Sequence, residues 1–369
     1  MEPNKRTMEN MVKSLEQSYR KKKVFITGHT GFKGTWLVGM LSKLDANIAG
    51  FSLEPSQENI QYSFIKNKLT NDFIGDIRNP KQIKKAIEEF NPDIVFHLAA
   101  QPLVIDSYLD PENTYSTNVL GTLNVLEACK GVPNLKAVVC VTTDKVYENK
   151  ETHHPYSESD QLGGYDIYSS SKACCELLVS SFRNCFFNIK DFKSHNVLIA
   201  TARAGNVIGG GDWSKNRLIP DLVRTALEEG ITDIRSPEAI RPWQHVLDCL
   251  TGYLMLGERL LNKEIFFAQA WNFAPHKDNV LSVLKIIDEA KKYWDKIDYE
   301  VHETSKEFHE ANLLLLDNTK ALKELKWNPQ LTIKDSVQMS VEWYKSYFLE
   351  QQNLMFNQIT KYLNTNNPL

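Results

Sequence analysis

Three glycines occur at regular spacing in the stretch Val24-Phe25-Ile26-Thr27-Gly28-His29-Thr30-Gly31-Phe32-Lys33-Gly34. A short apolar run precedes them and an amphipathic segment, 36–44, follows them, so the order strand, tight turn, helix is predicted. Gly28 permits the turn, Gly31 lets the backbone approach a phosphate, and Gly34 lets helix and strand pack closely. The free N–H groups and the dipole of the helix start then favour a diphosphate. This context indicates a dinucleotide-binding turn.

The composition is that of an ordinary globular protein. The chain has 369 residues, of which 42% are hydrophobic and 24% charged, and its formal net charge is −3. No basic surface is implied, so nucleic acid is not an expected partner. No apolar run approaches the roughly 20 residues that span a bilayer, and residues 1–23 lack the apolar core of a signal peptide. We expect a cytoplasmic protein without a membrane partner.

The six cysteines give no sign of a disulfide or zinc framework. None of them forms a Cys-x-x-Cys pair, and most lie in apolar patterns typical of strands or helices. They are Cys129, Cys140, Cys174, Cys175, Cys185 and Cys249. We interpret them as reduced thiols, and no metal site is predicted.

Strand-like and helix-like segments alternate along the first two hundred residues. Strands are predicted at 47–52, 73–77, 94–100, 137–142 and 196–202, and helices at 80–90, 111–129 and 169–185. This alternation predicts an α/β fold with a doubly wound parallel sheet.

The character of the sequence changes after residue 203. A glycine-rich stretch, helical segments and a last apolar run at 271–273 follow there. We predict a smaller C-terminal lobe over the carboxyl edge of the sheet, where ligands of such folds bind. The predicted domains are a helical or frayed extension at 1–22, a Rossmann domain at 23–203 with 243–262, and a lobe at 204–242 and 263–369.

A candidate catalytic pair lies in Tyr168-Ser169-Ser170-Ser171-Lys172. In a helix the first and last of these residues share a face. The lysine cation would stabilise the phenolate and lower the pKa of the tyrosine from about 10. A tyrosine so tuned serves as a general base near neutral pH. The motif alone is common, but the glycine turn and the hydroxyl-rich strand end at Thr142-Thr143 favour a catalytic role.

Together these motifs resemble the extended short-chain dehydrogenases/reductases of the nucleotide-sugar 4,6-dehydratase type. Within that family the chain is most similar to the branch that acts on CDP-glucose. The resemblance covers roughly residues 23–347. It rests on residues 27–34, 97–101, 142–147, 168–172, 202–213, 241–248 and 317–327.

The resemblance implies a lyase with bound NAD that is used and regenerated within one turnover. Tyr168, with Thr143 and Lys172, would take the proton from the sugar C4 hydroxyl while hydride leaves C4. The resulting ketone acidifies the C5 proton, a base removes it, and water leaves from C6. Hydride then returns to C6, which gives a 4-keto-6-deoxy sugar still attached to its nucleotide.

The pair Asp144-Lys145 departs from relatives that act on dTDP-glucose or GDP-mannose, which carry Asp-Glu after the catalytic threonine. Asp144 is the expected acid for the C6 hydroxyl. Lys145 would be the C5 base only if burial or a neighbouring cation lowered its pKa well below about 10.4. Otherwise it stabilises the enolate, and both roles stay open.

The resemblance also implies two sets of binding residues. For NAD they are Gly28, His29, Gly31, Phe32, Lys33, Gly34, Asp76, Ile77, Leu98, Ala99, Ala100, Tyr168 and Lys172. For the nucleotide sugar they are Gln101, Asn206, Arg217 and Arg241. His29 stands where many relatives carry a small residue, so its side chain either crowds the diphosphate or points outward. Glu54 has the sequence distance of a ribose-binding acid, with a solvated loop carboxylate as the alternative.

Three other functions remain open. The first is the same dehydration acting on GDP-heptose, GDP-mannose, or a dTDP- or UDP-sugar. The second is an NDP-sugar 4-epimerase, and the third is a dinucleotide sensor without catalysis. The charged pair Asp144-Lys145 favours dehydration over epimerisation, and the retained Thr143, Tyr168 and Lys172 argue against a sensor. The resemblance further implies a homodimer or homotetramer formed through helices 111–129 and 169–185, and a role in deoxysugar and polysaccharide biosynthesis.

Overall fold

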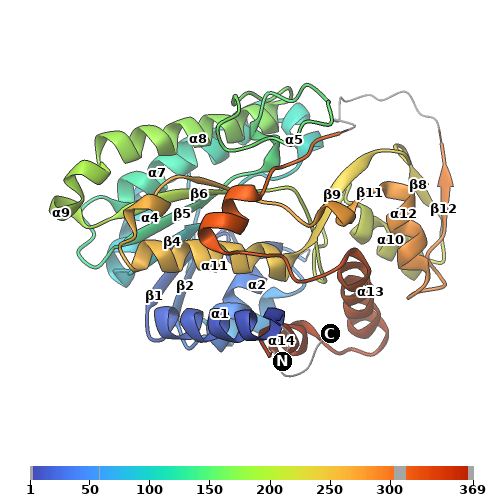
Figure 1. Cartoon of the computed structure of the whole chain (residues 1–369). Helices are drawn as coiled ribbons and strands as arrows, with labels where there is room; N and C mark the ends of the chain where they lie inside the picture. The colour runs from blue at the N-terminus through green and yellow to red at the C-terminus, as the bar shows by residue number, and fades with distance from the viewer. Residues whose placement is uncertain (1–2, 58, 303–312, 365–369) are drawn as a thin grey trace.

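A parallel sheet forms the centre of the molecule (Figure 1). The computed structural model describes residues 3–57, 59–302 and 313–364. Within these residues the sheet has seven strands in the order β10-β6-β5-β4-β1-β2-β3. The strands are β1 (Lys23–Thr27), β2 (Asn47–Ser52), β3 (Asn71–Ile74), β4 (Ile94–His97), β5 (Ala137–Val141), β6 (Leu198–Ala204) and β10 (Ala270–Phe273). The predicted doubly wound α/β fold is confirmed.

Helices cover both faces of this sheet (Figure 1). On one face lie α2 (Phe32–Lys43) and α11 (Val246–Leu261), and on the other α4 (Pro80–Phe90), α7 (Gly121–Cys129) and α8 (Ile167–Cys185). Successive strand residues point to opposite faces, so Val24 and Ile26 join one apolar core and Phe25 the other. No helix of the described residues is long and apolar enough to cross a membrane.

Most predicted elements are confirmed to within a few residues. β2 and α4 begin and end where predicted. β3 lies slightly earlier than the predicted strand 73–77, so Asp76 sits in the loop beyond it. The predicted helix 111–129 is divided into α6 (Pro111–Tyr115), a π-helical turn η2 (Ser116–Leu120) and α7. In that turn the side chain of Asn118 bonds to both the N–H and the carbonyl of Gln101.

The N-terminal extension is an ordered helix, α1 (Pro3–Tyr19), packed against α11. The Ser14 and Ser18 hydroxyls donate to the Glu258 carboxylate, and Tyr19 Oη donates to the Leu254 carbonyl at 2.8 Å. Tyr19 is fully buried. The extension therefore adds to the core of the main domain.

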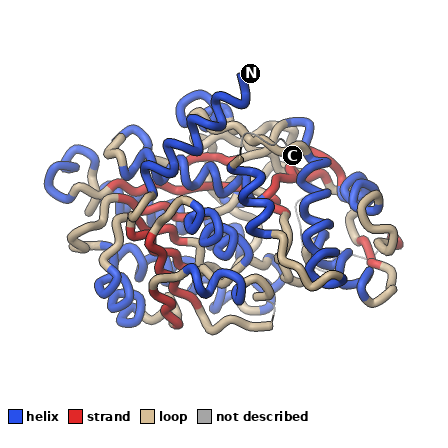
Figure 2. Tube along the Cα trace, turned by 90° about the horizontal axis from the view of Figure 1, so that it is seen from below, coloured by secondary structure: helices blue, strands red, loops and turns tan. Residues whose placement is uncertain are grey.

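A smaller lobe lies beside the carboxyl ends of the main strands, and Figure 2 shows it to one side of the sheet from below. Its strands are β7 (Asn206–Ile208), β8 (Thr232–Ile234), β9 (Ile240–His245), β11 (Val280–Ser282) and β12 (Tyr299–Val301). Its helices are α10 (Leu218–Leu227), α12 (Val283–Lys291) and α13 (Ile333–Leu349). The last helix, α14 (Met355–Leu363), returns to pack against α2.

Strand β10 requires a correction to the predicted lobe. It lies inside 263–369, which we assigned to the lobe, yet it pairs in parallel with β6 from Ala270↔Thr201 to Phe273↔Ala204. Trp271 and Phe273 are fully buried there, because the edge of the main sheet offers both an apolar face and unpaired backbone groups. The other domain boundaries remain a proposal.

Candidate active site

One cleft of about 1530 Å³ follows the carboxyl ends of the main strands and continues beneath the lobe. It gathers the predicted site residues from across the chain, with the single exception of His29. Those that line it are Gly28, Gly31, Phe32, Lys33, Gly34, Asp76, Ile77, Leu98, Ala99, Ala100, Gln101, Thr143, Asp144, Lys145, Tyr168, Lys172, Asn206, Arg217 and Arg241. The predicted NAD, catalytic and substrate groups therefore share one space.

The glycine turn has the geometry of a diphosphate cradle. Gly28 has a φ of 75°, and a Cβ on Gly34 would lie 2.1 Å from the Gly28 carbonyl oxygen. The N-cap of α2, Gly31, provides no side-chain bond to the first amides, and the first turn carries no acid. These amides face the cleft with the positive end of the helix dipole, an arrangement that fits the diphosphate of NAD.

His29 points away from the cleft. Its ring is buried, and Nε2 lies 3.0 Å from Asp72 Oδ1 on β3. Gly50 leaves room for it, since a Cβ there would approach the ring to 2.3 Å. Of the two orientations considered from the sequence, the structure therefore has the one that leaves the diphosphate position open.

The outer end of the cleft carries polar groups that the sequence did not single out. The hydroxyls of Thr30 and Ser52 are 2.7 Å apart, and Asn59 Nδ2 donates to the Thr30 carbonyl at 3.0 Å. All three residues line the cleft, with Glu54 exposed beside them. The sequence signal for this part of the site was Ser52, a hydroxyl residue at the last position of β2. This end suits a ribose, whose hydroxyls both donate and accept hydrogen bonds.

The predicted catalytic residues Thr143, Asp144 and Tyr168 lie together in the cleft. Thr143 Oγ1 donates to Asp144 Oδ1 at 2.9 Å, and the Thr143 side chain lies close enough to the Tyr168 phenol to affect its pKa. All three are at least nine-tenths buried. Burial raises the pKa of Asp144, although Lys145 and Thr143 oppose this change. A carboxyl that holds its proton in this way is suited to act as an acid.

The expected lowering of the Tyr168 pKa is not found. Burial raises the pKa of this phenol to about 12, and the Thr143 side chain only partly compensates. Lys172 is buried as well, which lowers its own pKa, and its Nζ donates to the Val141 carbonyl at 3.4 Å. The effect of burial on the pKa of both groups is larger than the stabilisation of a phenolate by Lys172 that we predicted from their helical spacing. Lys145 is half-buried in the turn after β5.

The predicted substrate residues come from both sides of the cleft. Arg217 Nη1 donates to the buried Asp212 Oδ2 at 2.8 Å, a partner that the sequence analysis did not name although it lies in the quoted stretch 202–213. Arg241 is buried, and its positive charge partly opposes the rise in the pKa of Asp144 that burial causes. The Gln101 amide instead holds its own loop, donating to the Leu103 carbonyl at 3.0 Å.

Trp213 and Trp243 line the cleft, whereas Trp271 is fully buried in the core.

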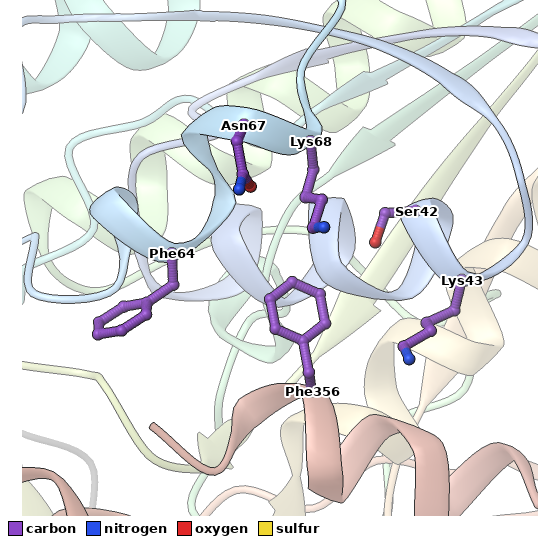
Figure 3. A pocket seen from close by; sticks show the side chains of 6 residues that line it. All are labelled: Ser42, Lys43, Phe64, Asn67, Lys68 and Phe356. Carbon is purple, nitrogen blue, oxygen red and sulfur yellow. The ribbon is translucent and has the colours of Figure 1, made fainter. Parts of the chain in front are cut away.

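A second, smaller pocket lies where α14 meets α2 (Figure 3). Its lining is entirely different from that of the main cleft and consists of Ser42, Lys43, Phe64, Asn67, Lys68 and Phe356. The Lys43 and Lys68 ammonium groups lie 6.0 and 5.5 Å from the centre of the Phe356 ring. We interpret these contacts as packing of α14, because cations commonly rest on aromatic faces.

Known proteins match this chain over almost its whole length. Residues 25–340 match the family described as GDP-mannose 4,6-dehydratase. The chain belongs to this family. A CDP-glucose 4,6-dehydratase of Salmonella typhimurium is 44% identical over 340 residues, covering 90% of this chain and 93% of that protein. The CDP-paratose 2-epimerase of Salmonella typhi is 24% identical, with 88% and 99% covered.

Solved structures support the same fold. An epimerase from Methanothermobacter thermautotrophicus superposes with a TM-score of 0.79 at 23% identity, covering 92% of this chain and 96% of that one. The UDP-glucuronic acid 4-epimerase of Bacillus cereus, solved with UDP-glucuronic acid and NAD, gives 0.74 at 22% identity, with 88% and 100% covered. Both comparisons show that this chain has the fold of these proteins.

Proposed function

We propose that this protein is an NAD-dependent lyase that converts CDP-glucose to CDP-4-keto-6-deoxyglucose. The observation that carries the proposal is the gathering of Thr143, Asp144 and Tyr168 in one cleft, in a chain 44% identical to a CDP-glucose 4,6-dehydratase. The alternative substrates are other nucleotide sugars, since related chains with lower identity act on several of them.

The cofactor is NAD. The turn Gly28 to Gly34 and the uncapped start of α2 would hold its diphosphate, and Lys172 would hold its nicotinamide ribose. When bound there, NAD accepts a hydride from C4 of the sugar and returns it to C6.

The residues of the chain supply the proton transfers. Tyr168 Oη would take the proton of the C4 hydroxyl as a phenolate, and the positive charge that bound NAD brings to the cleft would lower the phenol pKa that burial raises. Thr143, beside the phenol, would orient that hydroxyl. The ketone at C4 makes the C5 proton acidic. Asp144 gives its proton to the departing C6 hydroxyl, which its raised pKa favours. Lys145, next in the chain, removes the C5 proton or stabilises the enolate.

The substrate diphosphate would be held by arginines of the lobe. Arg241 is buried near Asp144, and Arg217 is oriented by Asp212 at 2.8 Å. A guanidinium group suits this task because it forms paired bonds to phosphate oxygens and keeps its charge. Asn206, the first residue of β7, lines the same cleft.

We further infer a homodimer or homotetramer formed through α7 and α8. Large apolar side chains are exposed on and beside these helices, among them Leu120, Leu177 and Phe186, at 54%, 60% and 49%. Exposed apolar groups gathered on one pair of helices are typical of an interface. Light scattering of the purified protein tests this assembly. The six free cysteines of the described chain suit a reducing compartment, and we place the enzyme in cytoplasmic deoxysugar synthesis for polysaccharides.

The deciding experiment incubates purified protein and NAD with CDP-glucose, dTDP-glucose, UDP-glucose, UDP-N-acetylglucosamine and GDP-mannose. Mass spectrometry reads the loss of one water. Loss from CDP-glucose alone supports the proposal, and loss from another sugar keeps the chemistry but replaces the substrate. An unchanged mass with an inverted C4 would instead establish an epimerase.

A further inference from the structure

A buried carboxylate lies beneath the catalytic groups. Glu176 follows Tyr168 and Lys172 on α8 at successive helical turns, and it is 4% exposed. It accepts hydrogen bonds from the Thr142 hydroxyl at 2.5 Å, from the Thr201 hydroxyl at 2.7 Å and from Arg203 Nη2 at 2.8 Å. One side chain thus joins α8 to strand end β5 and to β6.

The pair Glu176 and Arg203 is charged. Burial opposes ionisation of the carboxyl, but Arg203 and the donated bonds hold the pKa of Glu176 below its usual value. Glu176 in turn holds the pKa of Arg203 above its usual value. Arg203 Nη1 also donates to Tyr147 Oη at 2.8 Å, which donates to Asn272 Oδ1 at 2.7 Å. Arg203 is therefore held by Glu176 on one side and by Tyr147 on the other.

Stability alone is a weak explanation for this pair. The cost of removing two charges from water commonly offsets their attraction, so an apolar pair of similar volume often folds as well. The hydrogen bonds of this pair also fix the distance of α8 from the end of strand β5 and from strand β6. Thr142 directly precedes Thr143, which donates to Asp144 and lies beside Tyr168.

We propose that Glu176 is a positioning residue that fixes the strand end bearing Thr143 and Asp144 against the helix bearing Tyr168. The Thr142–Glu176 bond is the link on the strand side. This bond holds the side chains of Thr143 and Asp144 at a fixed distance from Tyr168 before the sugar binds. Such preorganisation of the reacting groups accounts for a large part of the rate enhancement of enzymes. The inference rests on the proposed function for its kinetic consequence, but not for its structural one.

Two threonines offer a matched test. Replacing Glu176 itself would leave the Arg203 charge buried and unpaired, which risks loss of folding. Thr142→Val and Thr201→Val each remove one bond to the same carboxylate at similar volume. The two residues are 6% and 0% exposed. Thr201 lies on the neighbouring strand β6, opposite Cys140, and is not part of the segment that bears Thr143 and Asp144. Thr142→Ser restores the hydroxyl.

We expect Thr142→Val to lower kcat for dehydration by about 10-fold or more, with KM for the nucleotide sugar within about twofold. Thr201→Val should keep kcat within about twofold while lowering the melting temperature at least as much. Thr142→Ser should recover most of the rate. Equal losses of kcat in the two valine variants would show a merely structural network and overturn the inference.

Hydrogen exchange tests the same point without substrate. Amides of residues 142–147 should exchange up to about 10-fold faster in Thr142→Val, because one buried hydrogen bond is lost. They should be unchanged in Thr201→Val. Unchanged exchange in both variants contradicts the inference. A wild-type protein that dehydrates no sugar refutes the proposed function instead, and the exchange comparison then decides the positioning role alone.

Discussion

The buried ring of His29 contacts the partly exposed carboxylate of Asp72 beneath the glycine turn, with Nε2 and Oδ1 3.0 Å apart. Tyr62 Oη donates to the other oxygen of the same carboxylate. The turn that would hold the diphosphate is therefore supported from behind by β3 and by the segment before η1 (Lys66–Lys68).

This contact predicts a dependence of stability on pH. Burial lowers the pKa of His29 despite the opposing effect of Asp72, so the folded chain resists a proton that the unfolded chain accepts below about 6.5. Stability should fall as the pH falls from 7 to 5, by about 1 kcal/mol for each unit by which the pKa is lowered. Urea unfolding of wild type and His29→Gln measures it, and the variant should lack this contribution. A slope shared by both proteins would contradict the prediction.

Close approach at the turn predicts a severe effect of Gly34→Ala. The added Cβ would lie 2.1 Å from the Gly28 carbonyl oxygen. The backbone must shift, so we expect a loss of about 3 kcal/mol or more in unfolding free energy, and weaker NAD binding. Gly230→Ala is the matched control, since its nearest neighbour would be 3.6 Å away. Thermal melts that do not separate the two variants would count against this geometry.

The assignment of Asp144 as the acid predicts the alkaline side of the rate profile. Burial raises the pKa of this carboxyl, so the protonated form persists to higher pH and kcat should fall as the pH rises through that pKa. Asp144→Asn should lower kcat by about 100-fold or more and remove this descending limb. The profile of kcat for water loss measures both effects. A variant that keeps the limb would assign the acid elsewhere.

Lys145 is predicted to serve the elimination and not the oxidation. Lys145→Met should slow water loss by about 100-fold while a single turnover still produces NADH absorbance. Rapid mixing with absorbance, followed by mass spectrometry, separates the two steps. Lys150→Met is the control, since Lys150 is exposed and lies 3.8 Å from Glu148. Equal loss of oxidation and elimination would remove Lys145 from the C5 step.

Arg241 is predicted to bind the substrate diphosphate. Arg241→Ala should raise KM for CDP-glucose by about 10- to 100-fold, the effect of one charge-assisted hydrogen bond. The control is Arg20→Ala, a surface arginine whose side chain is 73% exposed. Initial rates at varied sugar concentration measure it. A change confined to kcat would place Arg241 with the reacting atoms instead.

Local sequence patterns were sufficient for much of the main sheet. Alternating apolar segments and turn signals located β2 and α4 at their observed bounds, because each carries its own periodicity and cap. All of the predicted site residues except His29 line one cleft. Parallel strands place their carboxyl ends at one edge, so motifs that follow strands must converge.

The remaining features depend on contacts between distant segments. The direction of His29 is set by Gly50 and Asp72, and the Tyr168 pKa by burial, so neither follows from spacing along a helix. The sequence of the four residues of β10 is equally compatible with a strand of the main sheet and with a strand of the lobe. Only the pairing with β6 assigns them.

The position of β10 has a consequence for how this protein can be divided or made. Its sheet is not encoded by one continuous segment, so a fragment ending at residue 203 would expose the bare edge of β6, which invites pairing with other chains. During synthesis that edge stays open until residues 270–273 have emerged. The part of the lobe between β6 and β10 is in this sense an insertion within a single folding unit, so the main sheet and this part of the lobe must be produced together.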